Sequence, residues 1–346
     1  MNPFKHLKGK VQTVRGLIEP EQLGPTLMHE HILCDVTPPG KFTAGVPDGE
    51  IKLENVWEIR YRWCDFPGNS RLDQVEVVAQ ELDHLKATGC RSIVDMSSVG
   101  MKRNPQGLLH IAEQSSLNII MGCGFYTEEF LPPEIREKPE GAIAEEIAFD
   151  ILHGEENSSI KAGIIGEIGC SGLWTSFEKR TMAAAVEVQK QSGAVVNVHP
   201  YRDPKAPLNI IRFIVNKGGD PGRTILSHID RTIFDAATLL KLAETGCIIE
   251  YDFFGIESSF YPFQDIDIPN DGMRLKWIRL LIDRGYLSQI LISQDICTKT
   301  RLVRYGGHGY GHIFQNIVPM MRRKNFSNEE INAILVENPC RMLTFV

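Results

Sequence analysis

The sequence predicts an α/β protein that folds as a single-domain (β/α)8 TIM barrel with a short N-terminal β-ribbon. Eight short apolar runs alternate with segments of helical periodicity along the chain. Most of these runs are apolar at successive positions, which is typical of parallel strands covered by helices. No linker divides the units. Eight units of this length match a closed barrel in number and size.

The first 23 residues are expected to form an arm that precedes the barrel at residues 24–346. Val11-Gln12-Thr13-Val14 and Leu17-Ile18 flank Arg15-Gly16, a pattern that predicts a short β-ribbon. The first barrel strand is expected at residues 26–31. Residues 34–70 are rich in Pro and Gly, with one helical piece at 53–62, and a long insertion after a strand is more often functional than filler.

Strands and helices then alternate, and several helices end at a glycine such as Gly89 or Gly193. The remaining strands are expected at 92–96, 117–123, 162–168, 194–199, 224–228, 247–253 and 289–295. Helices are expected at 72–88, 106–114, 142–152, 182–191, 208–216, 236–244, 274–284 and 329–336, the last with Ser327 as its N-cap. A doubly wound open sheet is the alternative, but its Gly-x-Gly-x-x-Gly turn after the first strand is absent.

Composition narrows the class of protein. The 346 residues are 42% hydrophobic and 23% charged, as in soluble globular proteins. A net charge of −7 argues against nucleic acid as a partner. No apolar run approaches the ~18 residues that span a bilayer, and the polar start lacks a signal-peptide core. Eight scattered cysteines without a Cys-x-x-Cys pair favour reduced thiols. We therefore expect a cytoplasmic protein that acts on a small molecule, and a homodimer is compatible with the sequence.

The first strand ends in Met28-His29-Glu30-His31. Alternate residues of a strand share a face, so His29 and His31 are expected to project together while Glu30 points the other way. Two imidazoles on one face can hold one metal ion, although two hydrogen-bonded histidines near a strand end are the simpler alternative. The choice depends on whether further ligands end the later strands.

Polar residues do end the later strands. Glu167 falls at the end of the fourth strand, His199 and His228 at the ends of the fifth and sixth, and Asp295 at the end of the eighth. Taken alone, each could be a hydrogen-bonded core residue or a helix cap. In a barrel all six side chains would converge on the face where active sites lie, and buried carboxylates need compensation. Two divalent cations about 3.5–4 Å apart could neutralise them and activate a shared water.

These segments resemble the phosphotriesterase family of the amidohydrolase superfamily over residues 9–346. The similarity lies in long ordered motifs: Gly24-Pro25-Thr26-Leu27-Met28-His29-Glu30-His31, Ile164-Ile165-Gly166-Glu167-Ile168-Gly169, Val196-Asn197-Val198-His199-Pro200, Ser227-His228-Ile229-Asp230-Arg231-Thr232, Asp295-Ile296, Lys299-Thr300-Arg301-Leu302 and Tyr305-Gly306-Gly307-His308-Gly309-Tyr310.

The resemblance implies a binuclear site, with Zn²⁺ as the expected metal. His29, His31 and Asp295 would hold one ion, and His199 and His228 the other. Glu167 stands where bacterial members carry a bridging carboxylated lysine, which puts activity on organophosphate triesters in doubt. A glutamate can bridge two cations without modification. Lys161 lies six residues earlier and is read as solvated.

The animal branch of the family is the most similar, and it implies hydrolysis of N-acetyltaurine to taurine and acetate. A metal-activated water would attack the amide carbonyl, with Asp295 and Glu167 as the catalytic carboxylates. Arg202 and Arg301 follow ligand-bearing strands, and guanidinium suits a sulfonate, although a solvated surface charge is the default for any arginine. A lactonase or phosphoesterase with the same metals, or an inactive anion-binding barrel, are the alternatives. Further candidates for contact with the substrate are Tyr126, His308 and Tyr310.

Overall fold

Eight parallel strands form one sheet in a computed structural model that describes residues 2–41, 49–154, 158–257, 261 and 263–346. The expected long loop after the first strand lies partly outside this range, at residues 42–48. Each predicted strand is present, which confirms the fold class. In spatial order the strands are β3 (Thr26–Glu30), β6 (Ser92–Asp95), β7 (Asn118–Cys123), β8 (Ile164–Gly169), β9 (Val196–His199), β10 (Thr224–Leu226), β11 (Ile248–Tyr251) and β12 (Ile290–Ile292).

The two edge strands, β3 and β12, meet and close the barrel. Beyond the end of β12 the backbone N–H of Asp295 donates to the carbonyl of His29, at 3.1 Å. The carboxylate of Glu30 accepts from the hydroxyl of Ser293 at 2.7 Å and from the backbone N–H of Ile296 at 3.0 Å. Glu30 therefore points away from the two histidines, as expected, and joins the first strand to the last.

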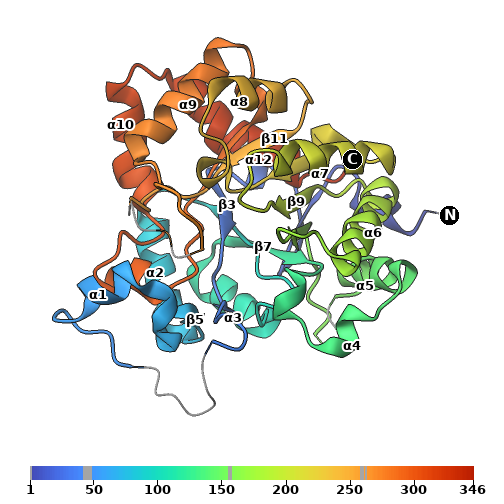
Figure 1. Ribbon diagram of the computed structural model, residues 1–346, viewed down its shortest axis with the longest axis horizontal. Coiled ribbons are helices and arrows are strands. Elements are labelled where there is room, and N and C mark those ends of the chain that lie inside the picture. Colours follow the sequence, from blue (N-terminus) through green and yellow to red (C-terminus); the bar gives the residue numbers. More distant parts are fainter. Residues whose placement is uncertain (1, 42–48, 155–157, 258–260, 262) are drawn as a thin grey trace.

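Helices surround the strands (Figure 1). Most of them follow a barrel strand and pack back against the sheet, as the alternating pattern predicts. They are α1 (Val56–Tyr61), α2 (Val75–Ala87), α3 (Pro105–Ser115), α4 (Pro133–Arg136), α5 (Glu140–Leu152), α6 (Ser176–Ser192), α7 (Ala206–Asn216), α8 (Ala236–Ala243), α9 (Asp271–Asp283), α10 (Val318–Arg323), α11 (Asn328–Asn332) and α12 (Asn338–Leu343).

The helices differ from the prediction in several places, and α4 was not predicted at all. Helix α6 starts at Ser176 instead of residue 182, because Thr175 and Glu178 form a capping box that begins the helix earlier. After β12 the structure has three α-helices where one was predicted, with one π-helical segment before α10 and another between α11 and α12. Ser327 does cap α11, since its side chain accepts from the N–H of Glu330 at 3.1 Å.

The N-terminal segment forms the predicted antiparallel ribbon, from β1 (Val11–Thr13) and β2 (Gly16–Ile18).

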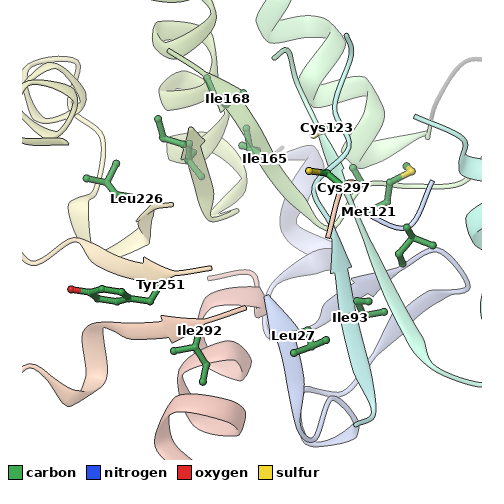
Figure 2. Close-up of a cluster of buried hydrophobic side chains, with 14 of the residues drawn as sticks. Leu27, Ile93, Met121, Cys123, Ile165, Ile168, Leu226, Tyr251, Ile292 and Cys297 are labelled. Atoms are coloured by element: carbon green, nitrogen blue, oxygen red, sulfur yellow. The ribbon is translucent and has the colours of Figure 1, made fainter. Parts of the chain in front are cut away.

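Apolar side chains pack on both sides of the barrel strands. The barrel interior contains one residue from most strands. The interior residues are Met28, Val94, Ile120, Ile164, Val195, Ile225, Ile248 and Leu291. The second layer fills the space between strands and helices. Figure 2 shows part of it, including Leu27, Ile93, Ile165 and Leu226.

The long segment after β3 includes a small antiparallel pair, β4 (Cys34–Asp35) with β5 (Arg71–Leu72). This pair holds the two ends of the long insertion together beside the barrel mouth. In the described part of the chain, no helix combines the length and the apolar character that crossing a bilayer would require.

Candidate metal centre

A β-bulge in β3 aims the first histidine into the barrel. Leu27 pairs with Ile93 and Glu30 with Asp95, so three residues of β3 span two of β6. Leu27 packs on the helix side and Met28 inside the barrel. Strict alternation would turn His29 outward with Leu27, but the extra residue reverses the side-chain direction.

Strand β8 uses the same device for Glu167. Ile165 pairs with Val196 and Ile168 with Val198, again three residues against two. Both isoleucines pack on the helix side, so Glu167 between them faces inward only because of the bulge. Gly166 makes this possible: its φ is +142°, and a Cβ there would lie 2.6 Å from the carbonyl oxygen of Asn197.

Three further residues of the predicted set lie at the mouth of the barrel. His199 is the last residue of β9 and needs no bulge to face inward. His228 and Asp295 follow β10 and β12, and both have left-handed φ values of 56° and 48°. Such backbone geometry is costly for residues with a Cβ and is concentrated at functional sites.

The structure brings all six predicted side chains to one centre. The Oε1 atom of Glu167 lies 2.6 Å from Nδ1 of His199, 2.7 Å from Nε2 of His228 and 3.7 Å from Nε2 of His29. The Oδ1 atom of Asp295 lies 3.2 Å from Nε2 of His31 and 3.9 Å from Nε2 of His29. Glu167 therefore lies between the two histidine pairs, as a bridging ligand would.

The donor set fits divalent metal ions. Nε2 of His29 is buried and has no hydrogen-bond partner among the described residues, although its ring is fixed from the other side. The ligand atoms of His29, His31 and Glu167 lie within 4.8 Å of one another, and so do those of Glu167, His199 and His228. Imidazole and carboxylate ligands suit Zn²⁺ and other first-row divalent ions.

Carboxylates behind the histidines fix their orientation. Nδ1 of His29 lies 3.1 Å from Glu250, and Nδ1 of His228 lies 2.8 Å from Asp252. Glu250 is itself held by the amide of Asn197 and the hydroxyl of Ser227, each at 2.9 Å. Such contacts leave Nε2 free to bind metal and strengthen it as a ligand.

Glu250 was not predicted as a site residue from the sequence. The signal available in the sequence was the placement of a carboxylate inside an otherwise apolar run, Ile248-Ile249-Glu250-Tyr251.

Electrostatics keep the two central carboxylates ionised. Burial alone would raise the pKa of Glu167, but His199 and His228 outweigh it and hold this pKa well below the usual range. Burial opposes ionisation of Asp295 too, yet the hydrogen bond from His31 and the charge of His228 lower its pKa. Burial lowers the pKa of His199 to about 4 despite Glu167, so its imidazole is neutral and able to bind metal.

A cavity of about 1120 Å³ opens above the centre. Tyr126, Arg202, Arg301 and His308 line it, as predicted for residues that contact substrate. Tyr310 is not among the lining residues: its buried hydroxyl donates to the carbonyl of His31 at 2.7 Å, so it supports the strand instead. Arg231, which the sequence analysis did not select, also lines the cavity.

Comparison with known proteins agrees with this geometry. A model of the phosphotriesterase family matches residues 9–343. The chain belongs to the phosphotriesterase family. Members of this family are metal-dependent hydrolases, in accord with the cluster of histidines and carboxylates at the barrel mouth.

Relatives within the family match almost the whole chain. N-acetyltaurine hydrolase of Xenopus tropicalis is 42% identical, over 98% of this chain and 99% of the relative. The protein of the same name from Homo sapiens is 41% identical, with the same coverage. Among solved structures, a resiniferatoxin-binding protein from Rhodobacter sphaeroides is 29% identical, with a TM-score of 0.93 over 99% of this chain and 98% of that chain.

A second solved member is more distant. The phosphotriesterase homology protein of Escherichia coli, complexed with phosphate in its active site, is 26% identical, with a TM-score of 0.76 over 93% of this chain and 99% of that chain.

Proposed function

We propose that the chain is a binuclear metal-dependent amidohydrolase that cleaves N-acetyltaurine to taurine and acetate. The convergence of four histidines and two carboxylates on one centre carries the chemistry. The substrate is inferred from relatives of that name at about 40% identity over nearly the full length. Arginines in the cavity above the centre support an anionic substrate.

The burial of several carboxylates around the centre supports bound cations. Glu167, Glu250, Asp252 and Asp295 are all buried there. Burial raises the pKa of Asp252 well above its usual value, and the charges of Asp230 and Glu250 raise it further, so divalent cations would favour its ionised form. Buried carboxylates without such compensation would strongly oppose folding. Zn²⁺ is the proposed metal, because imidazole and carboxylate are its usual ligands.

The proposed reaction adds water across the amide bond. Two divalent cations in this cradle would supply Lewis-acid polarisation of the carbonyl and a lowered pKa for water. Asp295 accepts a proton from the attacking water as the new C–O bond forms at the acyl carbon. It then donates that proton to the amide nitrogen as the C–N bond breaks, which releases acetate and the free amine.

We infer that Tyr126 stabilises the developing negative charge on the carbonyl oxygen. Its hydroxyl lies 3.5 Å from Nδ1 of His199. Burial raises the pKa of Tyr126 well above its usual value, and the charge of Glu167 raises it further. The phenol therefore stays protonated and acts as a hydrogen-bond donor at the edge of the metal centre.

A substrate panel tests this proposal. The purified protein, loaded with Zn²⁺, is assayed with N-acetyltaurine, neutral N-acetyl amines and small lactones, with amine release or lactone opening as the readout. We expect kcat/KM for N-acetyltaurine to exceed that for the neutral amides by about 100-fold. A neutral amide would leave the arginine side chains of the cavity without an anionic partner. Faster lactone opening would favour the lactonase alternative, and no turnover of any substrate would favour the inactive barrel.

A further inference from the structure

Arg231 lies directly behind the metal ligand His199. It follows His228 by three residues and is only 1% exposed, yet it lines the cavity. One Nη atom lies 3.0 Å from Nε2 of His199 and 3.2 Å from the carbonyl oxygen of Pro200. The guanidinium group is thus one imidazole ring away from the centre where the ligand atoms meet.

Arg202 follows His199 by three residues and also lines the cavity. Its Nε donates to the hydroxyl of Tyr261 at 2.7 Å, and its guanidinium stacks 4.7 Å from the ring centre of Phe263. Stacking fixes the plane of the guanidinium and leaves its other N–H groups free to bind a ligand. Burial lowers the pKa of Arg231, and the positive charge of Arg202 lowers it further.

Neither arginine has a carboxylate partner within the described part of the chain. This distinguishes them from Arg274, which is as buried as Arg231 but pairs with Asp230 and Asp271, each at 2.8 Å. A buried guanidinium group loses its hydration, and another positive charge in the same cavity repels it. A bound anion would remove both penalties.

Metal binding adds a second reason to expect an anion here. Nδ1 of His199 faces the centre, 2.6 Å from Glu167, so Nδ1 is the atom that would bind metal. A neutral imidazole bound through Nδ1 carries its proton on Nε2. In that state Nε2–H of His199 and an N–H of Arg231 are two donors that face each other, and one acceptor oxygen placed beside both would satisfy them.

We propose that Arg231 and Arg202, with Nε2–H of His199, form the subsite that binds the sulfonate of the substrate. This inference rests on the proposed function and specifies where its anion lies. Ordinary bond lengths place the sulfur of a two-carbon amino sulfonate about 4 Å from its amide nitrogen. A subsite one ring away from the metals suits this short spacer.

Arg301 has a different role in this scheme. One of its Nη atoms donates to the backbone carbonyl of Asp295. That contact braces the residue proposed to transfer the proton, so Arg301 is a positioning residue and the anion is held by Arg231 and Arg202.

The test compares charge removal at the subsite with charge removal elsewhere in the cavity. Arg231→Met, Arg231→Lys and Arg202→Met are prepared as Zn²⁺-loaded proteins, with Arg60→Met as the control, because exposed Arg60 lines the outer cavity. The substrates are N-acetyltaurine, its three-carbon homologue and the neutral methyl sulfone of the same shape. Binding of ethanesulfonate is measured by calorimetry, which does not depend on turnover.

We expect Arg231→Met to raise KM for N-acetyltaurine about 100-fold and to weaken ethanesulfonate by a similar factor, because a charged hydrogen-bonding partner is lost. Turnover of the neutral sulfone and metal content should change little. Arg231→Lys should recover part of the binding, Arg202→Met should act in the same direction, and Arg60→Met should stay within about 3-fold of wild type. The three-carbon homologue should be about 10-fold poorer than N-acetyltaurine with the wild-type protein.

Two results would overturn the subsite. An equal loss of kcat/KM for N-acetyltaurine and the sulfone in Arg231→Met would show that Arg231 only braces His199. Unchanged ethanesulfonate binding in both Met variants would place the anion elsewhere. Failure of the wild-type protein to hydrolyse N-acetyltaurine would instead refute the proposed function, and loss of ethanesulfonate binding in Arg231→Met would still support the subsite.

Discussion

Glu167 connects the two halves of the centre through a single oxygen atom. Its Oε1 contacts His199 and His228 on one side and approaches His29 on the other. Asp295 has a different environment: it contacts the first histidine pair alone and is slightly exposed to the cavity. The two carboxylates are therefore expected to have separable roles, one in holding metal and the other in moving a proton.

Substitution of each carboxylate should separate these roles. Glu167→Ala should lose at least one metal equivalent, because the Oε1 atom of Glu167 approaches the Nε2 atoms of both His29 and His228 and the Nδ1 atom of His199. Asp295→Asn should keep part of its metal but lose about 10²–10⁴-fold in kcat, the usual range for a general acid–base residue. Metal analysis and steady-state kinetics on the same preparations measure both effects. Full metal occupancy in Glu167→Ala, or unchanged turnover in Asp295→Asn, would remove the assigned role.

Residue identity made these ligands predictable, whereas the contacts around them were not. His199 and Asp295 could be recognised because each ends an apolar run. Arg231 could not, because an arginine shortly after a strand is most often solvated. Its burial against His199 depends on the short 3₁₀ turn Ile229–Arg231, whose path the sequence pattern does not specify.

At the scale of elements, two bulges place the ligands. Plain alternation predicted that His29 and His31 share a face, and this is confirmed, but it did not predict which face. Without the bulges, His29 would point to the helix-covered side together with Leu27. Glu167 would do the same together with Ile165. Bulges depend on local backbone pairing and have no strong sequence signal beyond a glycine such as Gly166.

Gly166→Ala tests the bulge in β8. The new Cβ would lie 2.6 Å from the carbonyl oxygen of Asn197. The alanine would also have to adopt the φ of +142° found at Gly166, which residues with a side chain rarely reach. We expect a loss of about 2–4 kcal/mol in the free energy of unfolding and a reduced metal content, measured by denaturant titration and metal analysis.

Gly141→Ala is the matched control, because its Cβ would meet nothing within 4 Å and it lies in helix α5. It should be neutral or slightly stabilising. Normal stability and metal content in Gly166→Ala would contradict the account of the bulge.

At the scale of the whole molecule, the apolar runs predicted the number and order of the strands. Runs that are apolar at successive positions indicate a parallel sheet covered by helices on both faces. Closure of the barrel was also expected from the number of units, but the contacts that join its two edges were not. One of them is made by Glu30, whose carboxylate reaches the end of β12 some 260 residues later in the sequence. Long-range contacts of single polar residues have no periodicity, so they could be seen only in the structure.

We propose that six side chains together hold two divalent cations and that amide hydrolysis requires both ions. The six are those of His29, His31, Glu167, His199, His228 and Asp295. Titration of Zn²⁺ into the chelated protein, with acetate release from N-acetyltaurine followed at each step, tests it most directly. We predict almost no activity without metal and a rise that saturates at two equivalents per chain, as expected when both ions act on one water. Full activity in the metal-free protein, or saturation at one equivalent, would contradict the account.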